Sequence, residues 1–180
     1  MRLRLIAKLL LVTCILAGRG VVAQSSTDSW QLKTSAAPSP NSLTLTLLAQ
    51  QEVKGWLRSG RPVLTIQCSA GTAAAYVETG VALEVTQVDQ QVIRVRFDDS
   101  DFRSERWREV GNWTISPRRP AQLIAQLLHS QRFLLEFTPF SSAPAQAVFA
   151  VQGLDHYSRP LATYCGIGEP AKDLLREHEK

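Results

Sequence analysis

Hydrophobic and polar residues alternate along much of the chain after residue 42, and this period of two is typical of a β-strand with one buried face. Leu43, Leu45 and Leu47 alternate with hydroxyl residues where the pattern begins. Similar segments recur at short intervals, separated by turns rich in Gly, Pro and Ser. The segments predicted as strands are 42–53, 62–68, 72–79, 81–87, 91–97, 111–116, 132–140 and 145–154.

One segment has a helical period instead. Pro120 suits the first position of a helix. Apolar residues follow it at helical spacing: Leu123, Ile124, Leu127 and Leu128. Segment 155–165 is ambiguous, because Pro160 opposes one unbroken helix. The pattern predicts a mainly β (α+β) fold, an antiparallel β-sandwich-like domain with one clear helix inserted before the last hairpin.

The first 23 residues have the layout of a secretory signal peptide. A basic start leads into an apolar run and then into small residues, so cleavage is expected between Ala23 and Gln24. The run is shorter than the ~20 residues that span a bilayer, which disfavours an uncleaved anchor. Lipidation at Cys14 is a further alternative, disfavoured because the apolar run continues past it. We expect export across the inner membrane to the periplasm, with no membrane span after cleavage.

Composition divides the remaining chain into three parts. Residues 24–42 are a Ser/Pro-rich segment, residues 43–168 hold the predicted strands and helix, and residues 169–180 are a charged tail. Trp30 is the one aromatic residue of the first part, and we expect it to dock on the core.

The signal segment also accounts for the net positive charge. The chain has 20 Lys and Arg against 16 Asp and Glu, and four of the basic residues but none of the acidic ones lie in residues 1–23. The mature chain is therefore neutral overall. Neutrality gives no indication of a nucleic-acid partner, and it favours a partner recognised by shape over one attracted by charge.

Two cysteines remain after cleavage, Cys68 and Cys165. In an exported protein an even pair most simply forms one disulfide, which would join the first half of the domain to its end. Two buried free thiols are the alternative, and the oxidising compartment favours the disulfide.

Four acidic residues gather in VRFDDSDFRSERW, residues 95–107: Asp98, Asp99, Asp101 and Glu105. A calcium loop needs acidic groups at alternate positions and a glycine at its turn. The glycine is missing here, and Arg103 occupies the next alternate position. Carboxylates on one turn also seldom face each other across a cleft, as glycoside hydrolysis requires. We therefore interpret the segment as a solvated loop with internal ion pairs.

No other motif indicates a catalytic, cofactor or metal site. The histidines His129, His156 and His178 are not at metal-ligand spacing. No G-x-S-x-G elbow is present, although a triad assembled in space leaves no such signature. Residues 112–114 (NWT) form a glycosylation sequon, which a bacterial host would leave bare. We predict that the protein is not an enzyme and has no catalytic, cofactor-binding or metal-binding residue.

Several motifs in a fixed order resemble the VasI/TagO family of periplasmic proteins associated with type VI secretion. The most specific are RPVLTIQC at 61–68, with the T-x-A-x-Y-V that follows, and FTPFSSAPAQAVFAVQGL at 137–154. The resemblance extends from Trp30 to Cys165. It implies an accessory protein that assists a cell-envelope secretion machine through contacts with protein partners, including subunits of that machine. It also implies the disulfide between Cys68 and Cys165, and it brings no catalytic residues.

A binding module for peptidoglycan or another envelope ligand is the alternative hypothesis. It is motivated by the charged segment and by tryptophans that would line a sugar or peptide groove: Trp30, Trp56, Trp107 and Trp113. Packing in the core and at the rim of a β domain is the commoner role of such residues. Hydrolytic activity is a third hypothesis, which rests only on unpaired acidic residues and histidines.

Overall fold

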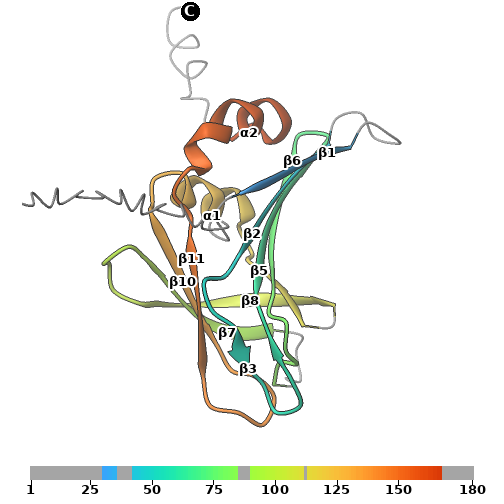
Figure 1. Ribbon diagram of the computed structural model, residues 1–180. Coiled ribbons are helices and arrows are strands. Elements are labelled where there is room, and N and C mark those ends of the chain that lie inside the picture. Colours follow the sequence, from blue (N-terminus) through green and yellow to red (C-terminus); the bar gives the residue numbers. More distant parts are fainter. Residues whose placement is uncertain (1–29, 36–41, 85–89, 112, 168–180) are drawn as a thin grey trace, which may run out of the picture.

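The computed structural model describes residues 30–35, 42–84, 90–111 and 113–167 (Figure 1). The expected cleavage site between Ala23 and Gln24, the tail at 169–180 and His178 lie outside the described residues. None of the helices within the described ranges has the length and apolar character needed to span a bilayer.

Within the described residues, nine strands form one sheet in which every neighbouring pair is antiparallel, so the predicted mainly β fold is confirmed. The strands lie in the order β1 (Gln31–Ser35), β2 (Ser42–Leu48), β5 (Val63–Ser69), β6 (Thr72–Glu78), β9 (Thr114–Ser116), β8 (Arg103–Gly111), β7 (Gln90–Phe97), β10 (Arg132–Phe137) and β11 (Ala145–Ala150). A separate small hairpin is formed by β3 (Val53–Lys54) and β4 (Ser59–Gly60).

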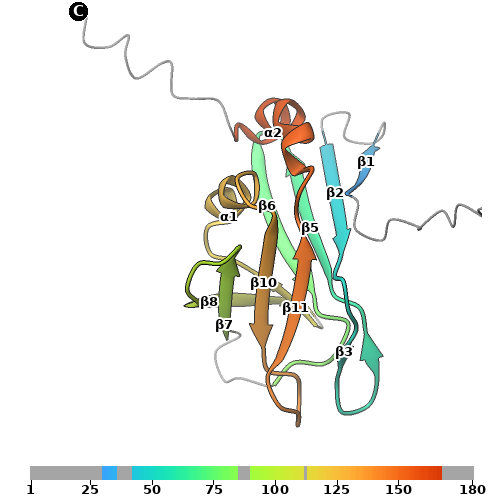
Figure 2. The same cartoon turned by 60° about the vertical axis from the view of Figure 1, so that its left-hand side comes forward.

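The sheet bends into two facing layers, as in a β-sandwich (Figures 1 and 2). One layer contains β2, β5 and β6, and the other contains β10 and β11. Just past β2, the backbone N–H of Gln50 donates to the carbonyl of Val148 in β11 at 2.8 Å. Trp30 Nε1 donates to the carbonyl of Val151 at 3.2 Å. These bonds join the first strands of the sheet to the last one.

The core lies between the two layers. Leu43, Leu45 and Leu47 are each at most 1 % exposed, so the predicted alternation along β2 is confirmed. On the opposite layer Phe133 and Phe149 are fully buried, and their rings stack with centroids 6.0 Å apart. Burial of aromatic and branched side chains from both layers supplies the main stabilisation of such a fold.

Two α-helices lie at one end of the sandwich (Figure 1). α1 (Pro120–Leu127) begins at the predicted proline. Its buried residues are those of the predicted stripe: Leu123, Ile124 and Leu127. The ambiguous segment forms a 3-10 turn, η1 (Leu154–Tyr157), followed by α2 (Ser158–Cys165). Pro160 lies in the first turn of α2, where its missing N–H removes no intrahelical bond.

Part of the Ser/Pro-rich segment joins the sheet. Trp30 is 7 % exposed and packs on the core, as predicted. The strand β1 that follows it pairs with β2 at the edge of the sheet, and the sequence does not predict this strand.

Residues 81–84 do not form the predicted strand. Among the described residues they form one isolated β-bridge, between Leu83 and Pro139. Residues 85–89 lie outside the described part of the chain. Gly80 has φ +72°, so the chain changes direction where β6 ends. The backbone of Gly80 packs so closely on Gly60 that a Cβ atom added to Gly60 would collide with the Gly80 carbonyl.

The charged segment at 95–107 is not a single loop, and this prediction is corrected. β7 ends at Phe97 and β8 begins at Arg103, so only five residues connect the strands. Trp107 in β8 is fully buried, whereas its neighbours Arg106 and Arg108 are exposed. One apolar residue among charged ones carries little periodic signal, which explains why the strand is not evident from the sequence.

Cys68 and Cys165 form the predicted disulfide, with Cα atoms 5.1 Å apart. Cys68 lies on β5 and Cys165 is the last residue of α2. The bond therefore fastens α2 to the sandwich and closes a loop between residues 97 positions apart.

Removing the disulfide should lower the free energy of unfolding by up to about 4 to 5 kcal/mol, because the unfolded chain regains the entropy of a long loop. Urea denaturation of wild type and of the Cys68→Ala, Cys165→Ala double variant measures the difference. The same loss is expected when wild type is reduced before denaturation. A double variant as stable as the oxidised wild type would contradict the stabilising role.

Candidate interaction surfaces

Asp98 fastens the turn after β7 to the start of β10. Its Oδ1 accepts hydrogen bonds from the backbone N–H groups of Gln131 at 2.9 Å and Arg132 at 2.8 Å. Its own N–H donates to the carbonyl of Arg132. The φ of Asp98 is +49°, a left-handed conformation that Asp and Asn tolerate better than most residues. The first aspartate of the charged segment is therefore structural.

The other acidic residues of the charged segment do not converge on one site. Asp99 forms an ion pair with Arg132 at 2.9 Å, and Asp101 is exposed. Glu105 lies on β8, where it pairs with Arg103 at 2.9 Å. In the part of the chain that the structure describes, no three His, Cys, Asp or Glu residues come together as metal ligands. The segment supplies one internal ion pair and one pair to a neighbouring strand.

The two described histidines are exposed and lie on different elements. His129 follows α1, and His156 lies in η1. His129 borders a surface cavity of about 640 Å³ together with Asp98 and Asp99. Both carboxylates are already engaged, by backbone N–H groups and by Arg132. The cavity is therefore poorly suited to general acid–base chemistry.

The four tryptophans fall into two pairs. Trp30 and Trp107 are 7 % and 0 % exposed. Their Nε1–H groups are satisfied by the carbonyl of Val151 and by Oε2 of Glu105. Trp56 and Trp113 are 64 % and 37 % exposed, so only this pair is available to a ligand or partner.

The exposed pair joins two further apolar side chains in a cluster that we call the aromatic tip: Trp56, Leu57, Trp113 and Phe140. Leu57 is 81 % exposed and Phe140 is 39 % exposed. The rings of Trp56 and Phe140 meet edge to face, with centroids 6.0 Å apart. The guanidinium of Arg58 lies over the Trp113 ring, 5.0 Å from its centroid. Together they line a shallow cavity of about 60 Å³.

The loops that carry the aromatic tip lie at the end of the sandwich opposite α2. Figure 1 shows β3 and the β10–β11 turn together at that end. Thr79 is fully buried, and its N–H and hydroxyl groups lie 2.8 Å and 3.0 Å from the carbonyl of Trp113. The N–H of Phe140 donates to the carbonyl of Ala82 at 2.9 Å. Backbone bonds between loops thus hold the tip in place.

Sequence reasoning missed Leu57 and Phe140. Both are large apolar residues within turns, Leu57 between β3 and β4 and Phe140 between β10 and β11. Turn positions are normally polar, so the apolar Leu57 between two predicted strands is the signal that would have identified it. Phe140 lies at the end of the predicted strand 132–140, and this end is wrong because β10 stops at Phe137.

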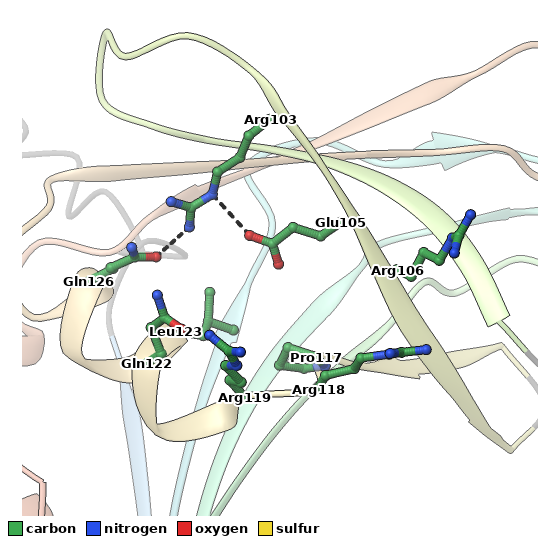
Figure 3. Close-up of a pocket in the computed structure, with 9 residues that line it drawn as sticks. All are labelled: Arg103, Glu105, Arg106, Pro117, Arg118, Arg119, Gln122, Leu123 and Gln126. Atoms are coloured by element: carbon green, nitrogen blue, oxygen red, sulfur yellow. Dashed lines mark hydrogen bonds and ion pairs between the residues drawn. The ribbon is translucent and has the colours of Figure 1, made fainter.

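A second surface is a cavity of about 410 Å³ between β8 and α1 (Figure 3). We call its cationic lining the arginine groove: Arg103, Arg106, Arg118 and Arg119. The first two extend from β8, and the others precede α1. The neutral total charge of residues 24–180 gives no hint of this concentration of arginines.

Glu105 is the one carboxylate among the described residues that line the arginine groove. Its Oε1 accepts a hydrogen bond from Arg103 Nε, and its Oε2 accepts one from Trp107 Nε1, both at 2.9 Å. Arg103 also donates to the side chain of Gln126 on α1 (Figure 3). Each oxygen of Glu105 thus has a partner, and the other arginines of the groove form no ion pair among the described residues.

A row of polar side chains crosses β7, β10 and β11. Glu136 accepts hydrogen bonds from Gln146 at 2.9 Å and from Arg94 at 2.7 Å, and its side chain is 16 % exposed. The hydrogen bond from Gln146, together with the hydrogen bond and charge of Arg94, lowers the pKa of Glu136 although burial opposes this. The carboxylate is therefore held ionised and links three strands.

No family model, curated protein or solved structure matches this chain. Its function is therefore inferred from its own residues and surfaces.

Asp98→Ala should lower the free energy of unfolding by about 1 to 2 kcal/mol, because two backbone N–H groups lose their acceptor. Asp98→Asn keeps an oxygen acceptor and tolerates the positive φ, so its effect should be much smaller. Asp99→Ala removes only an exposed ion pair and serves as the matched control, with little effect expected. Chemical denaturation measures all three, and an Asp98→Ala variant as stable as wild type would contradict the structural role.

Glu136 should make stability depend on pH in a defined direction. Because its pKa is lowered on folding, the carboxylate stabilises the fold fully above its ordinary pKa of 4.5, and this stability is lost as the pH falls through the lowered pKa. Glu136→Gln should therefore be less stable than wild type at about pH 7, with the difference shrinking at about pH 3. Urea denaturation at both pH values tests this. A difference independent of pH would contradict it.

Proposed function

We propose that this protein is a non-enzymatic accessory of the bacterial cell envelope that acts in the periplasm through contacts with other proteins. The aromatic tip is the contact surface, and its exposure is the observation that carries the proposal. The signal-peptide layout supports export, and the resemblance to the VasI/TagO family supports a role beside a type VI-like secretion machine. Subunits of that machine are the expected partners.

The composition of the aromatic tip favours a protein partner. Tryptophan is enriched among the residues that dominate protein–protein binding energies. Exposed apolar clusters on loops at one end of a rigid sandwich are typical of interaction sites. Trp56 and Leu57 are the two most exposed members, at 64 % and 81 %, and they are adjacent on the tip of one hairpin.

The shape of the aromatic tip disfavours a small ligand. Its cavity of about 60 Å³ is far below the ~300–1,000 Å³ of ordinary ligand pockets. Arg58 contributes the one charged side chain among the described residues that line it, and its guanidinium is engaged over Trp113. A sugar would need several polar groups beside the rings to orient its hydroxyls.

Photo-crosslinking tests the aromatic tip directly. A photoreactive amino acid replaces Leu57 in the full chain, and a matched control replaces Val92, which is also apolar and 64 % exposed but lies on β7. We expect secretion-machine subunits to be captured from position 57 and not from position 92. Equal capture from both positions would contradict the assignment of the surface.

Substitution should then remove the contact without unfolding the protein. Trp56→Ala with Leu57→Ala should weaken partner binding at least about tenfold, because the two side chains form the exposed centre of the tip. Val92→Ala is the control and should leave binding unchanged. Since these side chains are exposed, thermal unfolding should be nearly unaltered in both variants. Loss of secretion in the double variant is also expected, and unchanged secretion would argue against the function.

The peptidoglycan-binding alternative has its own readout. If the wild type pellets with purified peptidoglycan and the Trp56→Ala, Leu57→Ala variant does not, the tip is a wall-binding surface and the accessory proposal fails.

A further inference from the structure

Most of the described arginines outside the groove already have partners. Arg94 and Arg132 pair with Glu136 and Asp99. Others lie over aromatic rings, Arg58 over Trp113 and Arg96 over Phe102. The charges of Arg94 and Arg132 are therefore balanced by carboxylates, and the guanidinium groups of Arg58 and Arg96 are engaged by aromatic rings.

The arginine groove differs in this respect. Among the described residues, Arg106 and Arg119 form no ion pair, and Arg118 donates to the neutral amide oxygen of Gln90 at 2.9 Å. Arg118 also borders a neighbouring cavity of about 250 Å³ with Arg108, so the cationic surface continues along β8. Like charges gathered without counter-charges raise the free energy of the unbound protein and attract anions.

β8 has an open edge beside the groove. On one side β7 pairs with Arg103–Arg108, whereas on the other side β9 pairs only with Arg108–Gly111. Within the described part of the chain, the backbone of residues 103–107 therefore has a neighbouring strand on one side only. An open strand edge offers N–H and C=O groups to an added strand.

The chemistry of the lining selects among possible anions. Guanidinium groups bind carboxylates through paired hydrogen bonds. A single small anion would contact one or two of the arginines and leave the rest unbalanced. The described lining contains no aromatic ring on which bases could stack, which disfavours single-stranded nucleic acid. An extended acidic peptide satisfies both the arginines and the open strand edge.

We propose that the arginine groove binds an acidic polypeptide segment in extended conformation, added as a strand along residues 103–107 of β8. Carboxylates of the segment pair with Arg106, Arg118 and Arg119, and its main chain pairs with β8. This surface uses other residues than the aromatic tip, so the inference goes beyond the proposed function and does not depend on it.

Peptide binding to the purified full-length exported protein tests the inference. The probe is a short fluorescent peptide that alternates Glu and Thr, and the matched control peptide carries Gln in place of Glu. Fluorescence anisotropy should report binding of the Glu peptide, weakened by added salt, and no binding of the Gln peptide. Equal binding of the two peptides would overturn the proposal.

Charge variants locate the site. Arg106→Glu with Arg119→Glu should weaken binding of the Glu peptide at least about tenfold, and the corresponding Gln substitutions should weaken it less. Arg159→Glu is the control for the single Arg106→Glu variant, because Arg159 is exposed on α2 and each of the two substitutions changes the net charge by the same amount. Its effect should stay below about twofold. If Arg159→Glu weakened binding of the Glu peptide as much as Arg106→Glu does, the peptide would not bind at the arginine groove.

Further readouts separate the possible occupants. On peptide binding, the backbone amides of residues 103–107 that face away from β7 should become more protected from hydrogen exchange, and unchanged protection would overturn strand addition. Displacement of the peptide by inorganic phosphate at equal concentration, or tighter binding of a pyrimidine oligonucleotide, would also overturn the proposal. The Trp56→Ala, Leu57→Ala variant should bind the Glu peptide normally, which distinguishes failure here from failure of the proposed function.

Discussion

The closure of the sheet on itself is the constraint on which the rest of the structure depends. Gln50, just past β2, hydrogen-bonds to Val148 in β11, and Trp30 reaches Val151, 121 residues later in the chain. Closure buries one face of each layer against the other and covers part of the edge of β11, whereas β1 stays at the edge of the sheet. It also brings the β3–β4 hairpin beside the β10–β11 turn, so that Trp56 meets Phe140. The aromatic tip exists because the sheet closes.

The arginine groove arises where pairing within the same sheet is incomplete. β9 has only three residues and is followed by Pro117, which has no N–H to donate to a neighbouring strand. The chain then turns into α1 at Pro120, and the helix lies across a gap from the unpaired part of β8. The open edge and the cationic cavity therefore have one structural cause, the early end of β9.

The local distribution of charge determines recognition by a partner more than the total charge of the chain does. Residues 24–180 are neutral in total. Glu136 is nevertheless engaged by Arg94 and Gln146 at one place, while Arg106 and Arg119 have no ion pair among the described residues at another. At physiological ionic strength charges interact over only about 8 Å. A partner therefore responds to the local cluster and not to the sum over the chain, and a neutral total does not exclude recognition by charge.

The sequence by itself determined those elements whose own side chains alternate between buried and exposed. Leu43, Leu45 and Leu47 specify β2, and the stripe after Pro120 specifies α1. Cys68 and Cys165 are the two cysteines of residues 24–180, so the sequence favours one disulfide between them over two free thiols, and the structure contains it. β8 escaped prediction because Trp107 is its one buried residue among charged neighbours.

Only the tertiary structure decided which residues share a surface. Trp56 meets Phe140, and Arg106 lines the same cavity as Arg119, because strands distant in sequence pair and the sheet closes. Local periodicity records whether a residue faces the core of its own element. It carries no information about the element packed beside it, so the aromatic tip and the arginine groove became visible only in the fold.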